Sequence, residues 1–242
     1  MRGAVTLTAV RRPDLLARTL EDFDRHLRPG WPDGPVFVNV DPAMGTEADQ
    51  AQAVEVIRRH FPNAEVFEPE APGFGAAVTR LWSRVPDGPV LHLEDDWRCL
   101  APIDLEIAAD WLDHRVRMVS FVSVHHGRKG ERDFSEKRTR VSGLRRLWAA
   151  PRIEPLFNTG PALADGVFLR ELASRMDPAL DPEKQMRRPA NPTLNDWLGA
   201  YRCRFLKAPD GGALIHDTGR DWRDEQGIIK VVEVDRSSWT KK

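Results

Sequence analysis

Three adjacent carboxylates, Glu94, Asp95 and Asp96, follow a short apolar run at residues 89–93 that has the character of a buried strand. Carboxylates this close repel one another unless a cation or hydrogen-bond donors compensate their charge. Magnesium and manganese prefer such hard oxygen ligands, and either ion could also neutralise the diphosphate of a departing nucleotide. The other interpretation is a solvated acidic turn ahead of a helix, where the carboxylates would favour the helix dipole.

A glycine turn and an arginine that could hold phosphate precede the acidic run. Gly73 and Gly75 flank Phe74 at the start of a segment with helical periodicity, and a helix N-terminus offers backbone donors to an anion. Arg80 lies in the same predicted helix, and its guanidinium group suits anionic oxygens. Because glycines also mark ordinary turns and helix starts, the glycine pair alone is a weak sign of a ligand.

Candidates for acid–base and metal chemistry lie in the second half of the chain. Asp196 could accept the proton of an attacking hydroxyl, or it could form a capping box with Thr193 at a helix start. Asp165 and Glu183 are the alternative bases. His216 follows an apolar segment and could coordinate a metal through its neutral imidazole, although a lone histidine is also a common structural residue.

The elements that must position these residues follow an alternating pattern over the first hundred positions. Apolar runs at 4–10, 35–40, 65–67 and 89–93 predict strands, and helical spacing predicts helices after Pro13, from Thr46 with a capping box to Asp49, and over 75–85. This alternation is typical of a largely parallel sheet with crossover helices. Ligands bind outside the carboxyl ends of such strands, where the acidic run lies.

The second half is less regular. We expect helices at 103–114, 167–175 and 193–201, strands at 117–123, 203–207 and 213–216, and a polar tail over the last 25 residues. The basic stretch at 128–146 has few apolar anchors and predicts an exposed mobile loop, either a plain solvated surface or a lid over a diphosphate.

Composition restricts the class of protein. The chain has 242 residues with 36 basic and 37 acidic side chains, and a net charge of −1 argues against a nucleic-acid binder. The chain has two cysteines, Cys99 and Cys203, which are too few to stabilise a fold of this size through disulfide bonds. We therefore expect both thiols to be reduced. No export signal and no run of 18 apolar residues is visible, which makes the cytoplasm the default location.

The order of these motifs resembles the nucleotide-sugar-binding half of GT-A fold glycosyltransferases. The stretch from Thr6 to Pro13, Asp41 at a strand end, the glycine turn and the acidic run carry the resemblance. It implies a single GT-A-like α/β domain over 1–242, with a mostly parallel sheet flanked by helices. A nucleotide-sugar-binding half would span 1–100, an acceptor-side half 101–216 and a C-terminal tail 217–242. The implied activity is metal-dependent sugar transfer from a nucleotide-diphosphate sugar, with Mn²⁺ or Mg²⁺.

The resemblance also implies roles for single residues. Asp96 and His216 would bind the metal, and Asn195-Asp196 looks like the pair that often supplies a base. Glu94 would touch ribose or metal, although aspartate is usual at its position. The remaining residues of the implied donor site are Thr8, Ala9, Arg11, Asp41, Gly73, Arg80 and Asp95.

Two alternatives stay open. A nucleotidyltransferase normally shows a glycine-rich basic loop near its first strand, where this chain has residues 9–13 without glycine. A non-catalytic carbohydrate-binding or assembly protein could have kept the same fold. The expected partners are a nucleotide-sugar donor and a glycan, lipid or protein acceptor, with no nucleic acid and no transmembrane segment.

Overall fold

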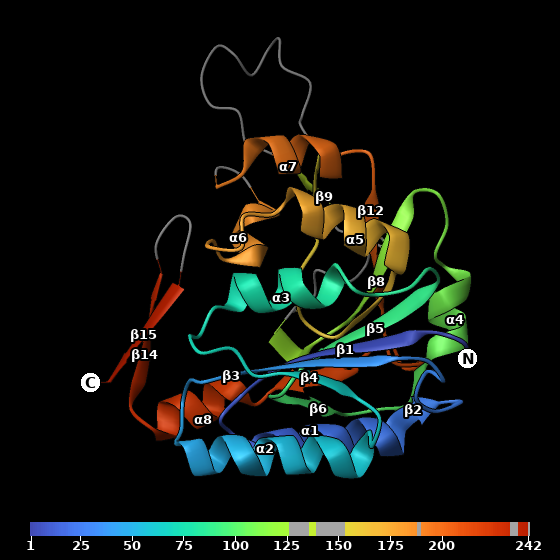
Figure 1. Ribbon diagram of the computed structural model, residues 1–242. Coiled ribbons are helices and arrows are strands. Elements are labelled where there is room, and N and C mark those ends of the chain that lie inside the picture. Colours follow the sequence, from blue (N-terminus) through green and yellow to red (C-terminus); the bar gives the residue numbers. More distant parts are fainter. Residues whose placement is uncertain (126–135, 139–152, 188–189, 233–236, 242) are drawn as a thin grey trace.

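A seven-stranded sheet lies at the centre of the computed structural model, between two layers of helices (Figure 1). The structure describes residues 1–125, 136–138, 153–187, 190–232 and 237–241. The strand order is β12-β8-β11-β5-β1-β3-β4. The strands are β1 (Ala4–Val10), β3 (Val36–Asp41), β4 (Glu65–Phe67), β5 (Pro89–Glu94), β8 (Val116–Phe121), β11 (Ala162–Asp165) and β12 (Arg202–Leu206). Only β11 runs antiparallel to its neighbours within this sheet, which confirms the predicted α/β fold with a mostly parallel sheet.

Helices cover both faces of the sheet. Figure 1 shows α1 (Pro13–His26) and α2 (Glu47–His60) on one side, and α3 (Phe74–Trp82) and α5 (Gly166–Arg175) on the other. The shorter helices are α4 (Leu105–Asp110), α6 (Pro182–Gln185) and α7 (Pro192–Leu198). Side chains alternate across each strand, so the sheet buries apolar residues on both faces, with Leu7 and Leu93 toward α1 and Val90 toward α3.

In the described part of the chain, four two-stranded sheets lie outside the central sheet, and two of them pair segments that are distant in the sequence. The strand β6 (Trp97–Cys99), directly after the acidic run, pairs with β13 (Ile215–Asp217). Helix α8 (Gly219–Glu225) follows, and then the hairpin of β14 (Ile228–Val232) and β15 (Ser237–Lys241). The other pairs are β2 (Leu27–Arg28) with β7 (Ile103–Asp104), and β9 (Glu136–Arg138) with β10 (Ile153–Pro155).

Most predicted elements are confirmed, and the exceptions have physical reasons. The Thr46–Asp49 capping box is present. The helix predicted at 103–114 is wrong at both ends, because Asp104 caps it and it ends at Asp110. The capping box of Thr193 with Asp196 is also wrong, since the helix begins at Pro192 and Asn191, two positions before Thr193, caps it through Leu194 N. Most of the predicted lid at 128–146 lies outside the described residues.

Two further expectations concern the environment of the chain. Both cysteines are free and buried, in agreement with reduced thiols. Among the described residues, no helix combines the length and the apolar character needed to cross a membrane.

Candidate functional site

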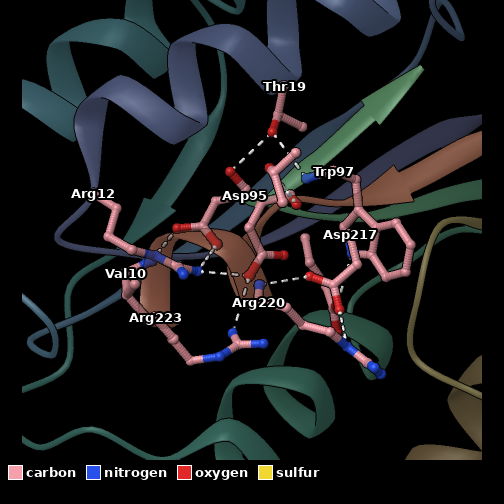
Figure 2. Close-up of polar contacts among 11 residues, drawn as sticks. Val10, Arg12, Thr19, Asp95, Trp97, Asp217, Arg220 and Arg223 are labelled. Carbon is pink, nitrogen blue, oxygen red and sulfur yellow. Dashed lines mark hydrogen bonds and ion pairs between the residues drawn. The ribbon is translucent and has the colours of Figure 1, made fainter. Parts of the chain in front are cut away.

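The acidic run lies at the carboxyl end of β5, where one arginine holds two of its carboxylates. Asp95 accepts hydrogen bonds from the backbone N of Val10 at 3.0 Å and from Arg12 Nη2 at 2.6 Å. The same Nη2 donates to Asp96 Oδ2 at 3.0 Å (Figure 2). Arg12 comes directly before α1, so the turn from β1 into α1 carries it to the end of β5. All three side chains are buried, which makes these pairs strong local constraints.

The C-terminal helix α8 meets the same carboxylate from the other side. Arg223 Nη1 lies 3.7 Å from Asp96 Oδ2, and the ring of Trp222 lies 5.3 Å from the guanidinium carbon of Arg12. Thr218 donates both its backbone N and its Oγ1 to the carbonyl of Asp96, each at 2.9 Å. A Cβ on Gly219 would come within 1.9 Å of Asp96 Oδ2, so this close approach requires glycine.

Two side chains fix the backbone and the aromatic ring around the acidic run. Thr19 Oγ1 donates to the carbonyl of Asp95 at 2.9 Å and accepts from the backbone N of Trp97 at 3.1 Å. Trp97 Nε1 donates to Glu94 Oε2 at 2.9 Å. The Trp97 ring also packs beside Gly160, where an added Cβ would lie 3.4 Å from it. The segment ahead of β11 therefore borders the acidic run.

Burial and neighbouring carboxylates raise the pKa of two residues of the run. The pKa of Glu94 is raised well above its usual range by burial first and by the charge of Asp96 second, with smaller contributions from Glu183 and Asp217. Burial also raises the pKa of Asp96 to about 6, against the opposing effect of Arg12. The site thus gathers Glu183 and Asp217 around the run. Asp217 accepts from the backbone N and the Nε of Arg220 at 3.2 and 3.0 Å (Figure 2).

The predicted donor residues form a second network at the ends of β1 and β3. Arg80 donates to the Oδ1 of Asn39, whose Nδ2 donates to Asp41 at 2.8 Å. Thr8 pairs in register with both Asn39 and Glu94, so the three side chains share the face of the sheet that α3 covers. This places Thr8, Asp41, Arg80 and Glu94 around one edge of the sheet.

Two more predicted donor residues take different positions. Arg11 Nε donates to Gln50 Oε1 at 2.8 Å, at the same end of the sheet. Ala9 lies on the opposite face of β1, in the core beneath α1 and α2. Only the backbone of Ala9 can therefore border a ligand at the edge that Thr8 lines.

The glycine turn has packing reasons of its own. The backbone N of Gly73 donates to Asp41 Oδ2 at 2.9 Å, so this donor is already used within the chain. A Cβ on Gly75 would lie 2.2 Å from the carbonyl oxygen of Leu180. The contacts favour the structural interpretation of both glycines, and a phosphate role for the helix start stays a prediction.

The three candidate bases lie in different places. Asp165 caps α5 through Phe168 N and pairs in register with Pro89, the first residue of β5, so it lies at the edge opposite the acidic run. Asp196 lies on the exposed side of α7. Glu183, on α6, is close enough to Glu94 to raise its pKa, and it accepts from the backbone N of Thr159 at 3.4 Å. Glu183 is therefore the candidate nearest the acidic run.

His216 and Asp96, the two predicted metal ligands, each have other partners within the chain. His216 Nε2 lies 3.7 Å from Asp221 Oδ2, and its ring centroid lies 5.6 Å from that of His125. Successive strand residues point to opposite faces, and it is Asp217 whose charge acts on the acidic run. In the part of the chain that the structure describes, no three His, Cys, Asp or Glu side chains are grouped to hold a metal.

Sequence reasoning missed Asp217, Arg12, Arg223 and Gly219 as parts of this site. Arg12 stands beside a predicted donor residue, but nothing in its spacing separates it from Arg11. The pairing of β6 with β13 and the hydrogen bonds of Thr218 to Asp96 bring the other three to the acidic run.

No protein-family model and no curated protein matches the sequence. The fold is similar to TarS from S. aureus, with a TM-score of 0.52 and 17% identity over 90% of this chain and 37% of that one. TarS residues 1–349 in complex with UDP give a TM-score of 0.52 at 16% identity, over 93% of this chain and 63% of that one.

A third similar structure is the mannosyltransferase PcManGT from Pyrobaculum calidifontis, solved in complex with GDP-Man and Mn²⁺. It gives a TM-score of 0.52 at 16% identity, over 90% of this chain and 57% of that one. The chain spans less than two thirds of the length of each of these structures. At such low identity the likeness shows the fold alone, which is a GT-A-like α/β fold.

Proposed function

We propose that this chain transfers a sugar from a nucleotide-diphosphate-sugar donor to an acceptor. The observation that carries the proposal is the pair of guanidinium groups at the donor edge. Arg11 and Arg80 donate to the side-chain amides of Gln50 and Asn39, which are neutral. An amide partner orients a guanidinium group without neutralising it, which supports a role of both cations in binding the diphosphate.

The residues of the site divide between holding the donor and accepting a proton. Thr8 and Asp41 line the edge that would receive the nucleoside, and Arg11 and Arg80 would stabilise the departing diphosphate as negative charge develops on it. A hydroxyl of the acceptor would attack the anomeric carbon, and a nearby carboxylate would accept its proton.

We assign the proton acceptor to Glu183 in preference to Asp196. Glu183 lies within electrostatic reach of Glu94, and the neighbouring Thr159 N and Arg187 hold its carboxylate at 3.4 and 3.8 Å. Its side chain is 38% exposed, which leaves it accessible to an acceptor. The sequence-based assignment of Asp196 stays a prediction, and so does the cytoplasmic location.

The two residues that the sequence predicts as metal ligands, Asp96 and His216, do not fit that role in this structure, because both have other partners. The PcManGT complex contains Mn²⁺. In this chain Asp96 contacts two guanidinium groups, and His216 pairs with Asp221. No step of the proposed reaction is therefore assigned to a metal.

Nucleotide release from a panel of UDP- and GDP-sugars, measured with a set of acceptor glycans, tests the function. Glu183→Gln should lower turnover about 10² to 10⁴-fold, because a general base typically contributes that much. Glu171→Gln is the matched control, since Glu171 forms the same kind of i,i+4 ion pair, with Arg175 on α5. Turnover of Glu183→Gln within threefold of wild type would exclude Glu183 as the base, and Asp196→Asn would then be measured.

The identity of the leaving group separates the alternatives. Release of a nucleoside diphosphate supports glycosyl transfer, whereas release of pyrophosphate from a nucleoside triphosphate indicates a nucleotidyltransferase. Donor binding without any release indicates a non-catalytic protein with the same fold.

A further inference from the structure

We infer that the chain compensates Asp95 and Asp96 of its acidic run with its own arginines, Arg12 and Arg223, in place of a divalent cation, and binds a nucleoside diphosphate without metal. The identity of this ligand rests on the proposed function. The arrangement of the arginines does not, because it follows from contacts within the chain.

The first observation is that the contacts of Asp96 leave Oδ2 enclosed. Arg12 Nη2 lies 3.0 Å from it, Arg223 Nη1 lies 3.7 Å from it, and the backbone of Gly219 packs directly against it. A divalent ion coordinated to this oxygen would stand beside two fixed positive charges. Coordination through Oδ2 would require α8 and its arginine to move away.

The second observation is that both carboxylate oxygens of Asp95 have partners within the chain. Its Oδ1 accepts from Arg12 Nη2 at 2.6 Å, and its Oδ2 accepts from the backbone N of Val10 at 3.0 Å. Charge-assisted bonds of this length are among the stronger hydrogen bonds in proteins. One guanidinium group therefore binds two adjacent carboxylates, which is the electrostatic task that a metal ion would otherwise perform.

The third observation is that the fold delivers the second arginine by several independent contacts. Thr218 makes two hydrogen bonds to the carbonyl of Asp96, and Trp222 packs on the guanidinium group of Arg12. The side chain of Arg223 is 16% exposed, so its charge is largely shielded from water and acts strongly on Asp96. Helix α8 thus holds the Arg223 guanidinium group against Asp96.

Two measurements on the full chain test this inference, with Mn²⁺, UDP and GDP as probes. Electron paramagnetic resonance of MnCl2 mixed with the chain should show the free-ion signal without nucleotide, and with nucleotide it should match the signal of MnCl2 and nucleotide without protein. Calorimetry should give dissociation constants for the preferred nucleotide that agree within about threefold in EDTA and in excess Mn²⁺.

The variant Arg223→Gln should create a metal requirement. Removing this cation leaves the charge of Asp96 less compensated beside the bound diphosphate, so nucleotide binding in EDTA should weaken about tenfold, and Mn²⁺ should restore it because Asp96 becomes accessible to the ion. Arg59→Gln, which removes an exposed arginine paired with Glu55 on α2, is the matched control and should change neither value. A melting curve checks that both variants are folded.

The outcomes separate this inference from the proposed function. Wild-type binding that weakens tenfold or more in EDTA overturns the arginine arrangement and leaves the sugar-transfer proposal standing. Failure of both nucleotides to bind under either condition contradicts the proposed function, and the Mn²⁺ signal then decides the inference alone. A bound Mn²⁺ signal that Asp96→Asn abolishes would overturn it.

Discussion

The acidic run and the donor edge both contain carboxylates at strand ends and arginines beside them, yet the pairs are arranged differently. In the acidic run, Arg12 contacts Asp95 and Asp96 directly. At the donor edge, Arg11 donates to Gln50, and Asp41 is held by a backbone N and the amide of Asn39. The two arginines are sequence neighbours, but Arg12 is hydrogen-bonded to carboxylates and Arg11 to a neutral amide. Whether an arginine can bind an anionic ligand therefore depends on whether its partner within the chain is a carboxylate or a neutral group, more than on its place in the sequence.

The two regions also differ in what assembles them. The donor edge is built from segments between Thr8 and Glu94, by strands that pair within the first hundred residues. The acidic run is completed by Thr218, which lies 122 positions away from Asp96 in the chain. The acidic run therefore depends on a long-range contact that the donor edge does not need.

The largest difference should appear in stability when the two neighbouring arginines are compared. Arg12→Met leaves two buried carboxylates without their shared cation, and breaking such a pair typically costs about 3–5 kcal/mol. Arg11→Met removes a bond to a neutral amide near the surface and should cost less than about 1 kcal/mol. Urea denaturation of both variants measures the difference. Equal losses would mean that the acidic run is not held by Arg12.

A smaller loss is expected when α8 is pushed away from the acidic run. Gly219→Ala places a Cβ 1.9 Å from Asp96 Oδ2, and relief of such a clash typically costs about 1–3 kcal/mol. Gly73→Ala is the control at the donor edge, since its Cβ would meet only Ala76 at 3.4 Å and its backbone is extended. Thermal melting compares the two. An unchanged melting temperature for Gly219→Ala would show that α8 is not packed on Asp96.

The same contrast explains how much of the fold could be predicted from sequence. Strands β1, β3 and β5 are apolar runs that end at polar residues, and the capping box at Thr46 marks the start of α2, so local patterns suffice. The four residues of β11 are too few to show a period, and their antiparallel direction depends on β5 and β8. Helix α8 has a polar sequence, and its contacts with the acidic run hold it in place.

The site was predictable to a similar extent. Asp41, Arg80 and Glu94 could be placed near one another because they lie on or beside strands whose carboxyl ends meet at one edge. The contacts of Asp96 with Arg223 and Gly219 could not, because they require the pairing of β6 with β13. Local pattern identified the carboxylates, and tertiary structure decided which cations reach them.

Substitution of Arg11 should weaken nucleotide binding, whereas substitution of the exposed Arg59 should not. Arg11→Met should weaken binding of the preferred nucleotide, UDP or GDP, about tenfold, because a hydrogen bond to a charged group is worth roughly 1.5–3 kcal/mol. The melting temperature should stay within about a degree or two of wild type, as expected for a surface substitution. Arg59→Met is the control, and calorimetry gives the dissociation constants. Unchanged affinity would remove Arg11 from the donor site.

The smallest expected effect concerns the two thiols, of which Cys99 lies on β6 beside the acidic run and Cys203 lies on β12. Burial raises the pKa of both thiols, that of Cys203 to about 12, so between pH 7 and 9 both are protonated and unreactive in the folded chain. Because β13 pairs with Cys99 through Ile215, displacing α8 and β13 in Gly219→Ala should expose Cys99 and leave Cys203 protected. Alkylation at pH 8, followed by peptide mass spectrometry, distinguishes the two positions. Equal labelling of both thiols in Gly219→Ala would indicate global opening instead of a local change at the acidic run. Selective labelling of Cys99 would show that α8 and β13 cover the acidic run as one unit.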